Sequence, residues 1–396
     1  MIRALSAVAL VALLPFAARA ENPIRIGFIT TFSGPNGVLG QDLADGFKLA
    51  LKKSNDQLGG RPVEVLYADD KSAPDQGRQL ADKMIESNGV QIITGINYSN
   101  VLLAVAKPAL DAGVFLLSPV AGPSQLAGRQ CHPHFFSVSW QNDTLTESIA
   151  IQMQKEGLSE AYFMAPNYPG GRDQLAGFKR YFKGAIAEAF TAFNQLDYSA
   201  EIAALRAKDP KSVVAFYPGG MGVNFYKQFA GSGLREKVPL YASGATLDQT
   251  TLPAIGDAAI GIKTPSMWSD ELDNAESREF VAAFQKEYGR MPSPNAAIAY
   301  DAGRLIDGAL ALIGGKIEDK AAFQNALERA PFKSVRGGFK FNTNHFPIQD
   351  FYLMKIAKND QGEVVPALQG LIAADVKDAY ADQCVMTPAR TNGDSR

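Results

Sequence analysis

The stretch VQIITGINYSNVLLAVAKPAL, residues 90–110, decides the fold. Its apolar start predicts a buried strand that ends near Thr94, where Gly95 turns the chain. Small polar residues follow, and the apolar segment 101–110 then predicts a helix. A helix that begins at the tip of a buried strand offers unpaired backbone N–H groups, and here also a hydroxyl. The stretch therefore predicts an anion-binding corner in an α/β protein.

Short apolar runs of the same kind recur along the chain. Most are too continuously apolar to alternate, so they predict strands that are buried on both faces, as in a parallel sheet. Amphipathic segments of helical length separate them, for example 40–56, 76–87 and 171–189. This alternation predicts an α/β fold with right-handed crossovers. The predicted strands are residues 24–30, 63–70, 90–95, 114–119, 161–167, 190–196, 213–220 and 238–245.

The chain is long enough for two lobes. Its 396 residues exceed what one core usually holds, and the alternation of strands and helices restarts after residues 135–143. Residues 275–312 predict more helix, and residues 337–357 predict a strand, a turn and a second strand. The polar tail from residue 373 is expected to be irregular.

The first twenty residues have the layout of a secretory signal peptide. Arg3 precedes an apolar stretch, and residues 18–20 form a small-x-small cleavage site. The alternative is a membrane anchor, but the stretch is short and Pro15 interrupts it. We therefore expect a secreted mature chain of 376 residues (396 − 20) that begins at Glu21. The residue directly after the cleavage site is not a cysteine, which argues against a lipid anchor.

The net charge limits the classes of partner that the chain is expected to bind, and its two cysteines indicate a disulfide. Without the signal, 37 basic residues (39 − 2) face 41 acidic ones, a formal charge of −4, so neither nucleic acid nor an anionic membrane is an expected partner. Cys131 and Cys384 are the two cysteines, and in an oxidising compartment we expect them to form a disulfide. Two free buried thiols are the alternative.

Signatures of catalysis are missing from the sequence. It contains no G-x-S-x-G elbow, no Walker loop and no G-x-G-x-x-G after the first strand. The segment CHPH at 131–134 lacks the further ligands that a tetrahedral metal needs. Asp69 and Asp70 have no evident acid–base partner, so a strand end or helix cap is the preferred interpretation. We expect no catalytic residue, no metal and no cofactor.

The carboxyl-terminal tips of the predicted strands are rich in glycine, proline, hydroxyl and tyrosine residues. Ligands of open parallel sheets bind outside these tips, and two lobes whose tips face each other form a cleft. Core packing is the alternative for Phe32 and Tyr217. The candidate pocket residues at the tips are Phe32, Tyr98, Tyr168, Tyr217, Gly219, Met221 and Ala245.

Three segments, residues 24–51, 89–126 and 172–182, give the chain its family resemblance. The sequence resembles periplasmic solute-binding proteins of the branched-chain amino acid type, which serve ABC importers. The resemblance implies two doubly wound parallel-sheet lobes of the type I class, joined by a three-segment hinge, that close on a ligand without chemistry. The implied N-terminal lobe is residues 21–139 and 268–345, the C-terminal lobe is 140–267 and 346–372, and 373–396 is the tail.

The resemblance also implies which residues hold the ligand. The ligand-contact serine of the family falls on Ser99, and Tyr98 and Tyr168 would line the pocket. The backbone N–H groups of the turn at 118–122 would hold a ligand carboxylate together with the Ser99 hydroxyl. Gly122 stands where amino-acid binders usually carry threonine or serine, so one hydroxyl is missing. The turn is Ser118, Pro119, Val120, Ala121 and Gly122.

A second departure from the family concerns the ligand. Amino-acid binders usually place an acid after the strand at 238–245, whereas residues 243–246 contain none and the next acid is Asp248. A buried ammonium without a counter-charge costs several kcal/mol. The sequence therefore favours a small aromatic carboxylate of the benzoate, hydroxybenzoate or phenylpropenoid type, as in the aromatic-acid-binding branch of the family.

Other functions remain open at this stage. The same scaffold could bind a branched-chain or other aliphatic amino acid, or serve as the ligand-binding module of a receptor. A secreted hydrolase would need a nucleophile and a base, and the three histidines, His132, His134 and His345, have no recognisable catalytic setting. The expected partners are the ligand and an ABC permease in the inner membrane, and the protein is expected to be a monomer.

Overall fold

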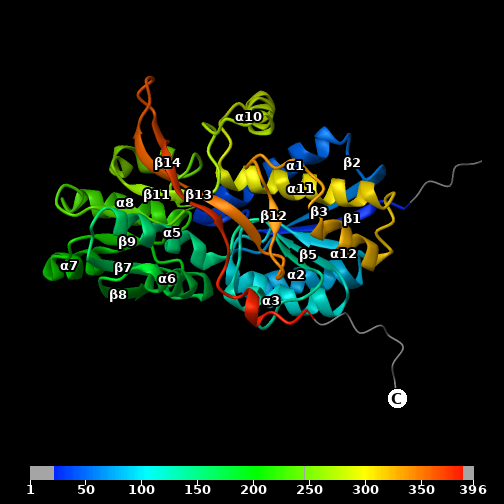
Figure 1. The fold of residues 1–396 in the computed structure, drawn as a ribbon, viewed down its shortest axis with the longest axis horizontal. Coiled ribbons are helices and arrows are strands. Elements are labelled where there is room, and N and C mark those ends of the chain that lie inside the picture. The colour runs from blue at the N-terminus through cyan, green and yellow to red at the C-terminus, as the bar shows by residue number, and fades with distance from the viewer. Residues whose placement is uncertain (1–21, 245, 387–396) are drawn as a thin grey trace, which may run out of the picture.

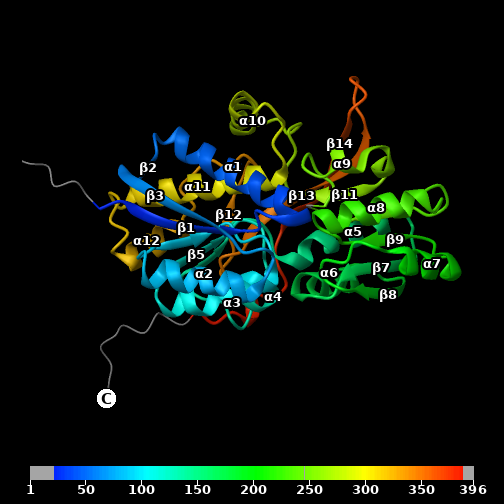
Figure 2. The same ribbon diagram turned by 180° about the vertical axis from the view of Figure 1, so that it is seen from behind.

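The computed structural model describes residues 22–386 except residue 245, so the predicted signal peptide and Ala245 lie outside the described residues. Two α/β lobes lie side by side, each built on its own sheet (Figure 1, and from behind in Figure 2). The predicted class of two lobes with mainly parallel sheets is confirmed. None of the described helices is long and apolar enough to cross a membrane.

The sheet of the N-terminal lobe has the strand order β2-β3-β1-β4-β5-β6 and is parallel except for the short β2. Helices α1 and α11 cover one face and α2 and α3 cover the other (Figure 1). The strands are β1 Ile24–Thr30, β2 Gln57–Leu58, β3 Arg61–Asp69, β4 Ile92–Thr94, β5 Phe115–Ser118 and β6 Phe135–Ser137. The helices are η1 Gly34–Asn36, α1 Gly37–Lys53, α2 Pro74–Glu86, α3 Ser99–Asp111, α4 Ser124–Ala127, α10 Ala275–Tyr288, α11 Pro294–Leu312 and α12 Lys320–Glu328.

The sheet of the C-terminal lobe has the order β12-β13-β11-β10-β9-β7-β8, and β14 pairs with β13. Its strands β7 to β11 are parallel, whereas β12, β13 and β14 run antiparallel to their neighbours. The strands are β7 Glu160–Pro166, β8 Ala185–Thr191, β9 Val213–Ala215, β10 Leu240–Ala242, β11 Lys263–Ser266, β12 Lys340–Phe341, β13 Pro347–Lys358 and β14 Val364–Val376. The helices are α5 Asn142–Lys155, α6 Pro169–Tyr181, α7 Ser199–Lys208, α8 Gly220–Gly231, α9 Leu252–Ile255 and η2 Gly256–Ala259, and η3 Ala381–Gln383 lies in the C-terminal segment that follows β14.

The chain passes between the two sheets three times. The passages lie between β6 and α5, between β11 and α10, and between α12 and β13, where the short β12 already pairs with β13. The boundaries expected from the sequence, 139/140, 267/268 and 345/346, lie within these passages and stay predictions. Within each lobe, parallel strands end at the same edge of the sheet, so the helices that follow them begin together at that edge.

One predicted helix and strand are misplaced in the C-terminal lobe. The sequence predicts a helix over 171–189 and a strand over 190–196, whereas α6 ends at Tyr181 and β8 occupies Ala185–Thr191. A side chain at Gly184 would lie 2.2 Å from the carbonyl oxygen of Ser159, so the chain runs close to β7 there. Because β8 is an edge strand with exposed side chains, its alanines and Glu188 resemble a helical surface in sequence.

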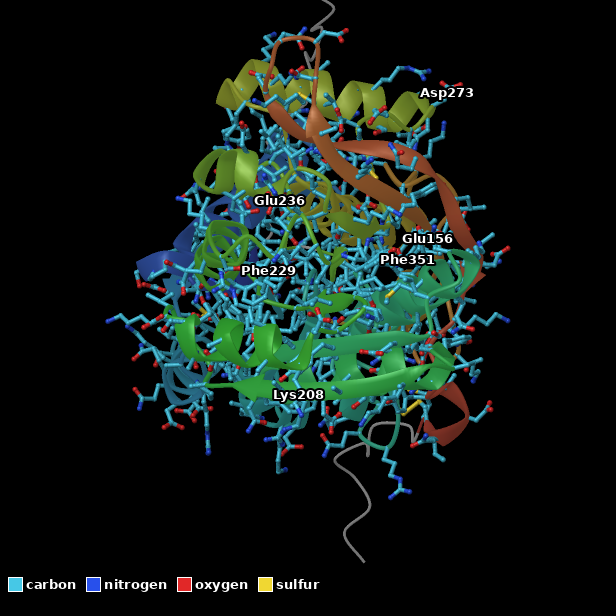
Figure 3. All side chains as sticks on the ribbon, turned by 90° about the vertical axis from the view of Figure 1, so that its left-hand side faces the viewer. Glu156, Lys208, Phe229, Glu236, Asp273 and Phe351 are labelled. Atoms are coloured by element: carbon cyan, nitrogen blue, oxygen red, sulfur yellow. A yellow bond between two sulfur atoms is a disulfide. The ribbon has the colours of Figure 1, made fainter. Side chains whose placement is uncertain are left out.

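The C-terminal segment is tied to the body of the protein. β14 continues through Val376, past residue 373 where an irregular tail was expected. A disulfide joins Cys131 to Cys384, as predicted, with 5.6 Å between the Cα atoms (yellow bond in Figure 3). Between these two points, the Tyr380 hydroxyl donates to the Asp143 carboxylate at the start of α5. The segment thus contacts both lobes.

Candidate functional site

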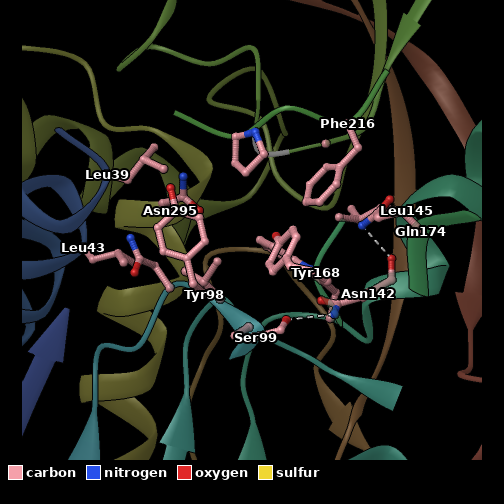
Figure 4. Close-up of a pocket in the computed structure, with 16 residues that line it drawn as sticks. Leu39, Leu43, Tyr98, Ser99, Asn142, Leu145, Tyr168, Gln174, Phe216 and Asn295 are labelled. Carbon is pink, nitrogen blue, oxygen red and sulfur yellow. Dashed lines mark hydrogen bonds between the residues drawn. The ribbon is translucent and has the colours of Figure 1, made fainter. Parts of the chain in front are cut away.

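A cavity lies between the two lobes, at the carboxyl ends of their strands (Figure 4). The empty space between its lining residues amounts to about 490 Å³, part of which is open to solvent. The lining residues are Leu39, Leu43, Asn97, Tyr98, Ser99, Val120, Ala121, Trp140, Asn142, Leu145, Tyr168, Gln174, Phe216, Pro218, Gly244 and Asn295. None of these described residues carries a charged side chain.

Several helices begin at the wall of this cavity. Ser99 and Asn142 are the first residues of α3 and α5, Tyr168 is the N-cap of α6, and Asn295 is the second residue of α11. Pro218 immediately precedes the N-cap of α8. A helix N-terminus carries a partial positive charge and unpaired N–H groups. The helix N-termini therefore place partial positive charge at a cavity whose described lining has no cationic side chain.

The N-terminus of α3 is the predicted anion corner. Tyr98 is extended (φ −114°, ψ 133°), and its side chain does not cap the helix. Ser99 is buried, and its Oγ accepts a hydrogen bond of 3.0 Å from Nδ2 of Asn142, which belongs to the other lobe. The hydroxyl proton of Ser99 therefore remains available for an acceptor in the cavity.

Asn142 connects the predicted turn at 118–122 to this corner. Its Oδ1 accepts from the backbone N–H of Gly122 at 3.1 Å, and its Nδ2 also donates to Asp173 at 3.0 Å. The Gly122 N–H, which was expected to hold the ligand, is thus engaged by Asn142 in this structure. A Cβ atom at Gly122 would lie 1.9 Å from the carbonyl oxygen of Trp140. Close packing accounts for glycine here, and there is no space for the threonine of amino-acid binders.

Asp173 links the lobes beside the cavity. Its carboxylate accepts the Ser124 backbone N–H at 2.9 Å and the Ser124 hydroxyl at 2.7 Å, in addition to the Asn142 amide. Burial, reinforced by the nearby charge of Asp143, raises the pKa of Asp173 to about 6. Because Ser124 is in the N-terminal lobe, this contact joins the two lobes.

Aromatic rings from both lobes meet across the cavity. The Tyr98 and Tyr168 rings lie edge to face with 6.3 Å between their centroids, and Tyr168 is nearly parallel to Phe216 at 6.2 Å. Phe193 packs against both tyrosines, at 5.4 and 4.9 Å. These rings and Trp140 provide flat apolar walls. Five predicted residues, Tyr98, Ser99, Val120, Ala121 and Tyr168, line the cavity.

Other predicted residues lie outside the cavity lining. Phe32 packs edge-on against Tyr67 at 6.5 Å. Tyr217 is fully buried against Tyr198 at 4.8 Å, in the core of the C-terminal lobe. The alternative interpretation, core packing, describes both residues in this structure.

Gly219 and Met221 lie at the start of α8. Gly219 is the N-cap with φ 59°, and a Cβ atom there would lie 2.7 Å from Oδ1 of Asn36. The neighbouring Gly220 N–H donates to the same oxygen at 3.2 Å. The sulfur of Met221 accepts from the Asn194 N–H at 3.3 Å. Gly219 is therefore close to the N-terminal lobe, whereas this contact of Met221 is within the C-terminal lobe.

The sequence reasoning missed most of the polar lining. Asn97, Asn142, Gln174 and Asn295 come from four different segments. Asn97 belongs to the quoted stretch and Asn142 opens a helix after a strand, so the rule that strand tips bind ligands could have indicated them. Asn295 follows the helix signal Ser293-Pro294, where the Ser293 hydroxyl caps α11.

The acids named from the sequence have structural roles. Asp248 accepts hydrogen bonds from Thr250 and from Nδ2 of Asn295. It does not line the cavity, whereas Gly244, four residues earlier, does. Asp69 and Asp70 accept backbone N–H groups at the end of β3, from Lys71 and Ser72 among others. The described residues contain no group of three or more potential metal ligands.

The comparisons with known proteins agree with this geometry. The model of a family described as periplasmic binding protein matches residues 23–362. A Brucella melitensis relative, "Leu/Ile/Val-binding protein homolog 6", is 27% identical over 91% of this chain and 94% of its own length.

Two solved structures are also similar. A solute-binding protein of an ABC transporter from R. palustris, in complex with benzoate, is 30% identical over 92% of this chain and 99% of its own, with a TM-score of 0.86. A solute-binding protein from Rhodopseudomonas palustris BisB5, in complex with 3,4-dihydroxybenzoic acid, is 29% identical over 90% and 99%, with a TM-score of 0.82. With two lobes, a cavity between them and a family match over most of its length, the chain belongs to the periplasmic binding protein family.

Proposed function

We propose that this protein captures a small aromatic carboxylate in the periplasm and delivers it to an ABC importer in the inner membrane. The observation that carries the proposal is a cavity with helix N-termini at its wall and no charged side chain among its described lining residues. The protein acts by binding and release, without catalysis.

The electrostatics of the cavity favour an anion. Each helix N-terminus contributes a partial positive charge and N–H donors, and each is worth typically 0.3–1 kcal/mol for a nearby anion. The Ser99 hydroxyl adds a donor at the same corner. An α-ammonium would meet the same positive field with no carboxylate in the lining, so an amino acid is disfavoured.

The walls of the cavity suit an aromatic ring. Tyr98 comes from the N-terminal lobe and Tyr168 from the C-terminal lobe, so closure would enclose a ring whose carboxylate is already held at α3. Burying the ring contributes about 25 cal/mol per Å² of apolar surface, and favourable contacts with the tyrosines add about 0.5–1.5 kcal/mol.

Closure of the two lobes on the ligand completes the proposal. Ser99 with Asn142 and Ser124 with Asp173 join the lobes beside the cavity, and Asn36 accepts from Gly220 at its edge. We infer that these contacts break when the lobes swing apart to admit or release the ligand.

The similar proteins differ in the class of ligand that they favour. The R. palustris relative of 30% identity holds benzoate, which is an aromatic carboxylate without an ammonium group. The Brucella relatives carry the name of branched-chain amino acid binders. An aliphatic amino acid is therefore the competing ligand class, although the uncharged lining does not favour it.

Titration calorimetry with four ligands tests the proposal. Benzoate has both a carboxylate and an aromatic ring. Benzamide lacks the negative charge, isovalerate lacks the ring, and leucine is an aliphatic acid with an ammonium group. We expect benzoate to bind with a dissociation constant of about 1 μM or below, near −8 kcal/mol, and the other three at least tenfold more weakly. Tight binding of leucine with no response to benzoate would overturn the ligand class and leave the fold intact.

A further inference from the structure

Three polar atoms in the lining of the cavity have no hydrogen-bond partner among the described residues. They are the hydroxyl of Tyr98, Nδ2 of Asn97 and Oδ1 of Asn295. All three side chains are buried, with exposed fractions of 1%, 8% and 2%. Buried polar atoms in native proteins are nearly always paired, because an unpaired one forfeits its hydration. Their partner is therefore to be sought in the ligand.

The contacts of Asn295 determine what its unpaired atom requires. Nδ2 of Asn295 donates to Asp248 at 3.2 Å, which leaves Oδ1 as an acceptor that needs a donor. The Thr31 hydroxyl gives its one proton to Asp70, so the Asn97 amide beside it can present either its donor or its acceptor to the cavity. The Tyr98 hydroxyl can act in either way. One group that both donates and accepts, such as a hydroxyl, complements this set.

Asn295 lies at a part of the cavity that is distinct from the carboxylate corner. In Figure 4, Asn295 lies beyond the ring of Tyr98, on the side away from Ser99 and Asn142. A ligand whose carboxylate lies at Ser99 and whose ring lies along Tyr98 would extend its far end toward Asn295.

We propose that the ligand is an aromatic acid with a hydroxyl group on the ring carbon opposite its carboxylate, and that Asn295 and Tyr98 select for it. The inference rests on the proposed function, since the carboxylate must be held at α3. The ligand hydroxyl donates to Oδ1 of Asn295 and accepts from the Tyr98 hydroxyl. An ammonium group would satisfy Asn295 but has no lone pair for the Tyr98 hydroxyl.

Calorimetry with three matched ligands tests the inference on the unaltered protein. The ligands are 4-hydroxybenzoate, benzoate and 4-methylbenzoate, in which the methyl group fills the place of the hydroxyl without hydrogen bonding. We expect 4-hydroxybenzoate to bind roughly tenfold or more tightly than either of the other two, because only it pairs the buried atoms. Equal or tighter binding of benzoate or 4-methylbenzoate would overturn the inference while the proposed function stands. If no aromatic acid binds, the proposed function fails and this inference fails with it.

Substitution of the selecting residues gives an independent readout. Asn295→Leu is expected to abolish the preference for 4-hydroxybenzoate over benzoate, and Tyr98→Phe, which keeps the ring, tests the donor in the same way if the first variant does not fold. The matched control is Asn224→Leu, because Asn224 bonds to Gly220 within α8 and lies outside the cavity lining. The ratio of the two affinities is measured within each variant, so a general loss of stability does not imitate the effect. An undiminished ratio in both cavity variants contradicts the assignment of these residues.

Discussion

Replacing Ser99 with alanine tests how the carboxylate is held. Ser99 is 2% exposed, lines the cavity and begins α3. A hydrogen bond from its hydroxyl to a carboxylate is charge-assisted and worth about 1.5–3 kcal/mol. The substitution should therefore weaken the binding of benzoate roughly ten- to a hundredfold.

The structure also indicates that Ser99→Ala will fold. Asn142 loses one acceptor, but its Nδ2 keeps the hydrogen bond to Asp173 and its Oδ1 keeps the one from Gly122. One of the two Nδ2 hydrogens of Asn142 loses its acceptor, at a cost of about 1–3 kcal/mol, whereas alanine is a good helix former at the start of α3. The thermal unfolding midpoint without ligand should therefore fall by only a few degrees.

Titration calorimetry on the variant and on a matched control measures this effect. Ser148→Ala is the control, because Ser148 is equally buried but donates to Thr144 within α5, away from the cavity lining. We expect the control to bind benzoate as the unaltered protein does. Unchanged affinity in Ser99→Ala, or equal losses in both variants, would refute the role given to the Ser99 hydroxyl.

Three further predictions concern packing, the disulfide and pH. Gly122→Ala should destabilise the protein because its Cβ atom has no space, whereas Gly231→Ala in α8 should not, and equal unfolding midpoints for the two would contradict this. Reducing the bond between Cys131 and Cys384 should lower the free energy of unfolding by about 2–5 kcal/mol, and an unchanged denaturation midpoint under reductant would contradict it. The pKa of Asp173 is raised to about 6 by burial in the closed form, so closure takes up a proton, and affinity should rise by at most about tenfold from pH 7 to pH 5. Asp173→Asn should remove that dependence, and a slope that persists in the variant would assign it to another group.

The strands that the sequence predicts best are those buried on both faces. β1 is almost wholly buried and β4 is wholly buried, so each is a continuous apolar run between turn signals. The prediction for the β8 segment was wrong for the opposite reason. An edge strand with exposed side chains is not a continuous apolar run in the sequence. Its Ala and Glu residues favour a helix locally, and only pairing with β7 makes the segment a strand.

The part of the site that lies at the tips of buried strands could be predicted from the sequence. Tyr98, Ser99 and Tyr168 follow buried strands directly, and they line the cavity. Side-chain direction was not predictable: Tyr217 was favoured, but the adjacent Phe216 faces the cavity while Tyr217 is buried in the core. Successive side chains on extended backbone point to opposite sides, so an error of one residue changes the surface that a side chain lines.

The residues that no local pattern identified come from the passages between the lobes and from late segments. Trp140 and Asn142 lie where the chain leaves the first sheet, and Asn295 reaches the cavity because α11 packs on α1. Their place depends on how the two lobes meet, which sequence periodicity does not encode. The same holds for Gly122, whose close approach to Trp140 becomes evident only in the folded chain.

The crystal structure of the protein with benzoate tests the central claim most directly. That claim is that a carboxylate is bound between the lobes by helix N-termini and the Ser99 hydroxyl, without a charged side chain. The account predicts a carboxylate oxygen within about 3 Å of Ser99 Oγ and the ring packed against Tyr98 and Tyr168. A benzoate whose carboxylate instead pairs with an arginine or lysine, or that binds outside the cavity, would contradict it.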